Sequence, residues 1–350
     1  MNFDEARTEL ASNYVSCKLE VKDCDRYLVV SRGPLDFEVT EEDITDYANT
    51  QEVRALLQFK PNECSICGKN YREQPVSLLN EYMDRYLSIP YGRHEIIFGE
   101  SSNEGLYVTI GGATNLYKNV FRFQDTYLQL CLERFRMPMT QDRVRAAKDK
   151  GKERVDIRDF MFSPTTIRVH NVSKHSVDDA LNYSSLIIEK CLFELSYLKG
   201  IPMGVVESWP QPRVVRHRTR REPFEFGEQV QGNCLPLREA TFNPDVIKFY
   251  QRALAADDPA IQFLSYYQVM EYYFLKVSEE RLYEALARRI NDSKFSTKPE
   301  YLDRIIQDVD KFKSKLDETS MLKEVLEKYI DEGDIIAFVR AYEKYLSEPL

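Results

Sequence analysis

The chain has 350 residues, 43% of them hydrophobic, and a formal net charge of −9. This length predicts two or three domains, and the acidic balance argues against a surface coated throughout by nucleic acid. No run of about 18 apolar residues is present, so no membrane span is expected. Seven scattered cysteines and a charged amino-terminal stretch without an apolar leader favour a reduced, cytoplasmic protein.

Residues 1–200 are expected to form an α+β region. Thr40 and Ser176 precede acidic residues at positions suited to helix N-caps. Gly200 is a stop signal for the helix that begins at Ser176. Expected strands are 26–30, 95–98, 106–110 and 167–172, and expected helices are 41–59, 77–87, 121–136 and 176–199. Residues 141–160 are rich in charge, which fits either a solvated helix or a loop.

Residues 201–241 contain five prolines and little periodicity, so they are expected to be a connector. The connector holds a dense basic run, and clustered arginines pair well with phosphate oxygens. Its basic side chains are Arg213, Arg216, His217, Arg218, Arg220 and Arg221. Two interpretations stay open: the run contacts RNA or a nucleotide, or it is a solvated linker that pairs with the acidic domains.

Residues 242–350 are expected to be all helix, as in a helical bundle. Asp258 and Pro259 are a strong start signal, because Asp caps the first N–H groups and Pro loses no bond at the first helical position. Expected helices are 244–256, 259–276, 279–290, 299–316, 320–331 and 333–346. The helix from Pro259 is apolar nearly all round, so we expect Leu264 and Phe274 inside a bundle core or at an oligomer interface.

The stretch 249–274, FYQRALAADDPAIQFLSYYQVMEYYF, resembles the first long core helix of the ApeA-like branch of the HEPN domains. The resemblance covers the last third of the chain, from about Phe242, and it rests on packing residues. It implies a HEPN-like bundle, a role in antiphage defence through RNA cleavage, and self-association through residues 266–274. The α+β region would then sense a phage component or restrain the bundle.

HEPN ribonucleases resemble one another in an Arg-x4–6-His motif, whose His performs acid–base chemistry on the RNA. The chain has four histidines and none follows Phe242, so the motif is missing from the helical region. Arg168 and His175 have the spacing but lie in the middle region, and such a pair arises easily by chance. Three hypotheses remain: an antiphage defence protein of the HEPN ribonuclease type, a non-catalytic RNA- or protein-binding regulator whose bundle has lost its nuclease residues, or the front part of a longer protein whose last helices carry the motif.

Cys64 and Cys67 form a CxxC followed by Gly, a spacing that lets two thiolates hold one zinc ion. This is half of a site, and Cys17, Cys24 or His94 are candidates for the other half. The alternative is a loop with two reduced cysteines. A zinc ion held here would be structural, since a four-ligand site has no open position.

Overall fold

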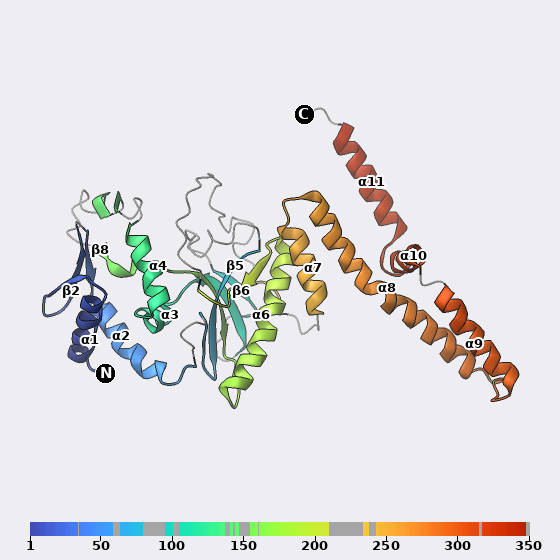
Figure 1. The fold of residues 1–350 in the computed structure, drawn as a ribbon, viewed down its shortest axis with the longest axis horizontal. Coiled ribbons are helices and arrows are strands. Elements are labelled where there is room, and N and C mark those ends of the chain that lie inside the picture. Colours follow the sequence, from blue (N-terminus) through green and yellow to red (C-terminus); the bar gives the residue numbers. More distant parts are fainter. Residues whose placement is uncertain are drawn as a thin grey trace. The chain divides into compact units, whose positions relative to one another are not determined.

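The computed structural model describes the chain in two compact units, Met1–Thr241 and Phe242–Leu350, and each unit is considered by itself. The described residues are 1–33, 35–58, 64–79, 95–100, 105–136, 141–142, 144–146, 155–159, 161–209, 234–237, 243–314 and 317–347. The first unit mixes helices with strands, and the second is helical (Figure 1).

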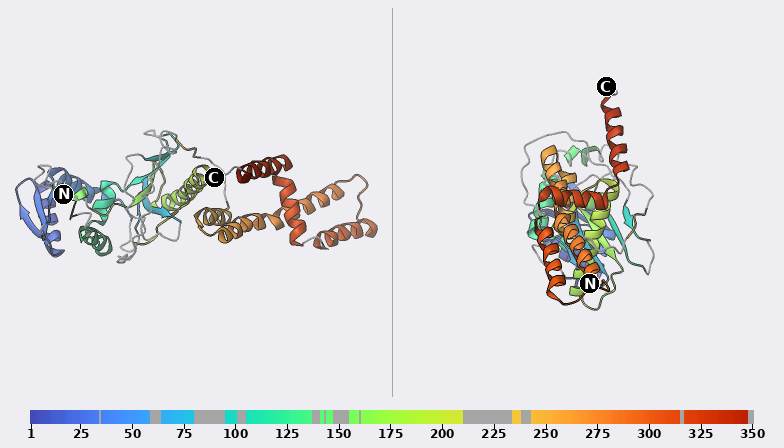
Figure 2. Two further views of the ribbon diagram at one scale, coloured as in Figure 1. Left: turned by 90° about the horizontal axis from the view of Figure 1, so that it is seen from above. Right: turned by 90° about the vertical axis from the view of Figure 1, so that its right-hand side faces the viewer.

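The amino-terminal part of the first unit is a small sheet with two helices beside it (Figure 2). Within the described residues the strand order is β1-β2-β3-β8, antiparallel except for the β3–β8 pair. The strands are β1 (Glu20–Asp23), β2 (Leu28–Arg32), β3 (Leu35–Val39) and β8 (Val155–Asp156), and the helices are α1 (Phe3–Ser16) and α2 (Glu41–Arg54). Asn2 caps α1 and Thr40 caps α2, which confirms the N-cap expected at Thr40.

An ion pair lies inside this layer. The Arg122 and Asp43 side chains are both about 1% exposed, and Arg122 Nη2 lies 2.6 Å from Asp43 Oδ2. Arg122 Nε also donates to the Tyr14 hydroxyl at 2.7 Å. Because the three residues come from α1, α2 and the end of α3 (Asn115–Phe121), the pair ties three helices together.

A second, larger sheet follows the order β10-β5-β9-β7-β6 among the described residues, with β4 also paired to β5, and all these pairs are antiparallel. Its strands are β4 (Ile66–Cys67), β5 (Tyr71–Leu78), β6 (Ile96–Phe98), β7 (Tyr107–Gly112), β9 (Thr165–His170) and β10 (Met203–Val205). Strands expected at 95–98, 106–110 and 167–172 are present within about two residues. The helix expected at 77–87 is wrong at its start, because Ser77 and Leu78 belong to β5, and residues 80–87 lie outside the described residues.

Helix α6 (Val177–Lys199) covers one face of this sheet (Figure 1). Its buried residues, such as Ile188 and Leu195, share a hydrophobic cluster with Ile167 and Val169 of β9. The expected cap is present: the Asp179 N–H donates to Ser176 Oγ at 3.0 Å. Gly200 ends the helix with φ of +65°, a conformation that costs glycine little.

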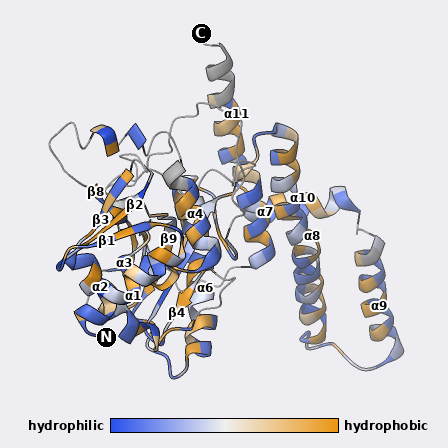
Figure 3. Ribbon diagram, turned by 60° about the vertical axis from the view of Figure 1, so that its left-hand side comes forward, coloured by the Kyte–Doolittle hydropathy of each residue, from blue (hydrophilic) through white to orange (hydrophobic). Residues whose placement is uncertain are grey.

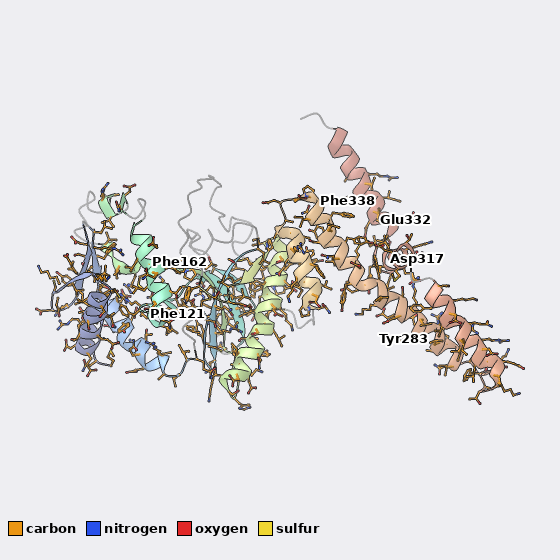
Figure 4. All side chains as sticks on the ribbon, viewed as in Figure 1. Phe121, Phe162, Tyr283, Asp317, Glu332 and Phe338 are labelled. Atoms are coloured by element: carbon orange, nitrogen blue, oxygen red, sulfur yellow. The ribbon has the colours of Figure 1, made fainter. Side chains whose placement is uncertain are left out.

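An aromatic cluster joins α3, α4 (Asp125–Arg136) and the segment before β9. The ring of Trp209 lies 5.2 Å from Phe121, 5.3 Å from Tyr127 and 6.1 Å from Phe162, measured between centroids. Figure 4 labels Phe121 and Phe162 within this region. Residues 121–136, expected as one helix, contain a break between α3 and α4 at 122–124.

The described residues of 201–241 pack within the first unit. Trp209 fills the aromatic cluster, while the Leu235 N–H donates to the Ile97 carbonyl at 2.8 Å and Gly99 donates back to Leu235 at 2.9 Å. Trp209 and Leu235, described residues on either side of 210–233, are therefore both packed within the first unit.

The second unit contains α7 (Pro244–Ala255), α8 (Pro259–Ile290), α9 (Pro299–Ser314), α10 (Glu318–Tyr329) and α11 (Glu332–Ser347). The Asp258 side chain accepts from the Ala260 N–H at 2.7 Å, so the expected start of α8 is present. Two separate helices were expected over 259–290, but α8 runs through without a break. Ser278 lies where the break was expected, and it is buried and donates to Glu324 of α10 at 2.7 Å.

Candidate functional site

The face of the larger sheet opposite α6 carries a polar cluster on β5, β9 and β7. Strand residues alternate between faces, and Ile167 and Val169 pack toward α6, so Arg168 and His170 lie on the other face. Glu73 and Thr109 flank Arg168 in the strand register. Two rows of polar and aromatic side chains thus cross three neighbouring strands.

Glu73 is a fully buried carboxylate at the centre of this cluster. Its Oε1 accepts from the Thr114 N–H at 3.0 Å and from Thr166 Oγ1 at 2.8 Å. Its Oε2 accepts from the hydroxyls of Tyr71 and Thr114, both at 2.6 Å. Burial, followed by the charge of Glu73, raises the pKa of Tyr71, so this phenol stays protonated and donating. With four donors, Glu73 is a fixed acceptor.

Arg168 is held between Glu95 and the backbone of β7. Its Nη2 lies 2.6 Å from Glu95 Oε1, and a Cβ added to Gly111 would lie only 2.8 Å from that nitrogen. A glycine at position 111 therefore gives the guanidinium its space. Arg168 Nε is buried without a hydrogen-bond partner among the described residues.

His170 is enclosed by aromatic rings. It stacks on Tyr107 with 4.3 Å between centroids, meets the edge of Tyr71 at 5.5 Å, and has Nε2 at 3.2 Å from Thr109 Oγ1. Burial and then the Arg168 charge lower the pKa of His170 from about 6.5, which favours neutral imidazole near pH 7. The contacts of His170 are those of a side chain fixed within the fold.

The predicted pair of Arg168 and His175 is not brought together by any described contact. Arg168 is buried within β9, whereas His175 is exposed in the turn before α6. The residue that shares a face with Arg168 is His170, which the sequence analysis did not select. The alternation of polar and apolar residues in Thr165–His170 is the signal that could have identified it.

Cys64 and Cys67 are buried in different hydrophobic clusters of the first unit, although they were predicted to share one loop. Cys64 packs with Tyr117 and donates toward the Val206 carbonyl, whereas Cys67 lies on β4 and packs with the α6 cluster. Cys17 packs beside the amino-terminal sheet, and His94 lies outside the described residues. Among the residues described, no group of three His, Cys, Asp or Glu side chains is placed to hold a metal ion. The zinc site stays a prediction.

The basic run from Arg213 to Arg221 lies outside the described residues. The described residues that flank this run include Trp209 before it and Leu235 after it, and Leu235 pairs with Phe98 of β6. The run is therefore flanked on both sides by residues packed in the first unit.

The second unit has a small buried core and much exposed apolar surface. Phe274 is 2% exposed and packs with Val277 and with Val325 of α10. Leu264, in contrast, is 57% exposed. The expectation that both residues lie in a core is thus wrong for Leu264, because α10 packs on the face of α8 that carries Phe274. Association with another surface remains the other expected way to cover Leu264.

No helix in the described part of the chain is both long and apolar enough to cross a membrane. Comparisons with protein families, with curated proteins and with solved structures find no match to this chain.

Proposed function

We propose that this chain is a regulator in an RNA-targeting antiviral defence system, and that it works by binding other protein surfaces and not by cleaving RNA itself. The proposal rests on two features of the chain after Phe242, which are its lack of histidine and its exposed apolar side chains. No histidine follows Phe242, whereas α8 and α11 expose large apolar side chains such as Leu264 and Phe338. The defence role rests on the HEPN resemblance alone.

The two described histidines support a non-catalytic chain. Acid–base catalysis on RNA needs a positioned group near a phosphate-binding one. His170 is engaged with Tyr107 and Thr109, and Arg168 beside it is paired with Glu95. His175 is exposed and is not placed beside an arginine by any described contact.

Incubation of the purified chain with labelled single-stranded RNA and transfer RNA tests this proposal. We expect no cleavage. Cleavage that disappears in His170→Ala or in His175→Ala would contradict the proposal and would identify the catalytic histidine. Cleavage that survives both changes would equally contradict it and would indicate a site elsewhere.

RNA contact through the run from Arg213 to Arg221 is a separate part of the proposal. Trp209, the single tryptophan, lies just before this run in the aromatic cluster, so its fluorescence can report a ligand there. We expect RNA to change the Trp209 emission, with an apparent affinity that falls as salt rises. Replacing Arg218, Arg220 and Arg221 together by Gln should abolish the change, whereas Lys276→Gln on α8 should not.

A further inference from the structure

The carboxyl-terminal part of α8 packs beside α9, and a groove runs between the two helices (Figure 1). An ion pair ties the helices together there, because Arg289 Nη2 donates to Asp308 Oδ1 at 3.0 Å. The groove encloses about 490 Å³ and is open to solvent. Figure 3 shows hydrophilic and hydrophobic residues mixed along this part of α8. All the residues that line the groove belong to the second unit, so its geometry does not depend on the first.

Basic side chains line this groove, in a chain whose net charge is −9. Four of its five charged lining residues are cations: Arg281, Arg288 and Arg289 of α8 and Lys311 of α9. The fifth, Asp308, is already paired with Arg289. Arg281 and Arg288 are seven residues apart, so they share one face of α8 with roughly 10 Å between them along the helix axis. Two cations therefore stand two turns apart on one side of the groove, and Lys311 stands on the other side.

Each of these three cations can take a new acidic partner. The Arg288 side chain is 82% exposed and lies 3.5 Å from Glu284. The Arg281 side chain is 43% exposed and pairs with two glutamates of α10. Lys311 is exposed, and no acidic side chain pairs with it in the described part of the chain. Exposed ion pairs contribute little to stability, so an acidic ligand can replace them at little cost.

Apolar side chains line the groove between the cations. Leu282 of α8 and Phe312 of α9 are both partly buried. Ala285 lies midway between Arg281 and Arg288, and its methyl group leaves room for a large side chain from a ligand. A surface that combines cations with apolar groups in this way is complementary to a helix whose one face is acidic and apolar.

We infer that the α8–α9 groove binds an amphipathic helix of another protein, which carries two acidic side chains seven residues apart and large apolar side chains between them. A helix that lies along such a groove meets it with its residues at i, i+3, i+4 and i+7. Its two acids pair with Arg281 and Arg288, and its apolar residues contact Leu282 and Phe312. This inference rests on the proposed function, since it specifies the kind of protein surface that the chain binds.

The apolar lining favours an acidic protein over a nucleic acid. A sugar–phosphate backbone gains nothing from contact with Leu282, whereas a helix held in a groove is anchored by apolar side chains. The net charge of −9 also repels a nucleic acid strand wherever it leaves these few cations. Because the groove is open, a small molecule would bury little of its surface there.

A displayed library of helical peptides tests the inference without knowledge of the natural partner. The peptides are alanine-based, about 16 residues long and randomised at positions 4, 7, 8 and 11, so that positions 4 and 11 have the spacing of Arg281 and Arg288. Selection on the purified chain should enrich Asp or Glu at positions 4 and 11 and large apolar residues at positions 7 or 8. Enrichment of basic residues at positions 4 and 11, or no enrichment there, would overturn the inference.

The enriched peptide, labelled and followed by fluorescence anisotropy, then locates its binding site. A chain with both Arg288→Glu and Lys311→Glu should bind it at least ~tenfold more weakly. The same peptide with Lys at positions 4 and 11 should bind this variant better than the original peptide does, which a variant that merely unfolds could not show. Lys248→Glu on α7 is the matched control, because Lys248 is exposed in the same unit but does not line the groove, and it should leave the affinity unchanged.

Three results would overturn the inference: equal weakening by the groove and control substitutions, no recovery by the charge-swapped peptide, or displacement of the peptide by an equal concentration of single-stranded RNA. The last result would show that the groove takes nucleic acid. Each of them leaves the proposed function standing, whereas RNA cleavage by the chain would remove the proposed function whatever the peptide does.

Discussion

The two units of this chain differ in which side chains they bury and which they expose. The first unit encloses charged and polar groups, such as Arg122 with Asp43, and Glu73 with its four donors. The second unit leaves large apolar groups such as Leu264 and Phe338 in water. A buried, satisfied polar network fixes one arrangement of a fold, whereas an exposed apolar stripe marks a surface intended for a partner. We therefore expect the polar network to stabilise the first unit, and we propose that the second unit takes part in association.

The largest effect is expected from breaking the buried ion pair. Arg122→Met removes the 2.6 Å partner of buried Asp43 and leaves only Arg158, whose Nε lies 3.9 Å from Asp43 Oδ1, so the free energy of unfolding of the first unit should fall by ~3–5 kcal/mol. Trp209 fluorescence during urea unfolding measures this unit, since it contains the single tryptophan. The control in the second unit is Arg281→Met, followed by circular dichroism because that unit holds no tryptophan; its pairs with Glu324 and Glu327 are partly exposed and should contribute at most ~1 kcal/mol. Similar losses for both variants would refute the comparison.

A leucine in each unit gives the next contrast. Leu10 of α1 is fully buried, so Leu10→Ala should lower the free energy of unfolding by ~2–5 kcal/mol. Leu264→Ala, at an exposed site, should lower the folding stability of the dilute monomer by less than ~1 kcal/mol. Unfolding followed by circular dichroism at low concentration checks both values, and a large loss for Leu264→Ala would place that residue in a core.

Glu73→Gln tests the polar cluster without changing its shape. The amide NH₂ would face hydroxyl and N–H donors, so at least one hydrogen bond is lost and a buried donor is left unpaired, at ~1–3 kcal/mol. Glu95→Gln is the control, because the Glu95 side chain is 47% exposed and water can replace its contact with Arg168. Urea midpoints of the two variants that coincide would show that the Glu73 network contributes nothing.

The smallest effect is a dependence of stability on pH. The pKa of His170 is lower in the folded protein than in the unfolded chain, where it is about 6.5. The folded state thus binds fewer protons, so the stability from neutral His170 is present above pH ~6.5 and is lost as pH falls through the folded pKa. His170→Gln should flatten the fall in the Trp209 unfolding midpoint below pH 6.5, and the exposed His175→Gln should leave it. An unchanged slope in His170→Gln would contradict this reading.

Local signals in the sequence were sufficient to predict the ends of helices that have clear capping residues. Ser176 and Gly200 bound α6, and Asp258 with Pro259 begins α8, because capping depends on neighbours within four residues. Strand β5 was missed because its polar residues hide the alternation. Arg72 is buried through hydrogen bonds to Ser184 and Ser185 of α6, more than a hundred residues away.

The candidate sites were likewise predictable only where their residues lie close together in the sequence. The alternation around Arg168 and His170 is local, and it could have placed both on one face of a strand. The donors to Glu73 come from β5, β9 and the residue before α3, so no short window contains them. Helix α8 is apolar nearly all round, and its sequence does not say which face meets α10. Because α10 packs on the face that carries Phe274, Phe274 is buried and Leu264 is exposed.

The mass of the purified chain in solution tests the central claim most directly. Light scattering at micromolar concentrations should give twice the 41.1 kDa of one chain, and Leu264→Glu should return the mass toward 41.1 kDa. A mass of 41.1 kDa at every concentration up to the millimolar range would contradict the expected association of copies through the helical unit.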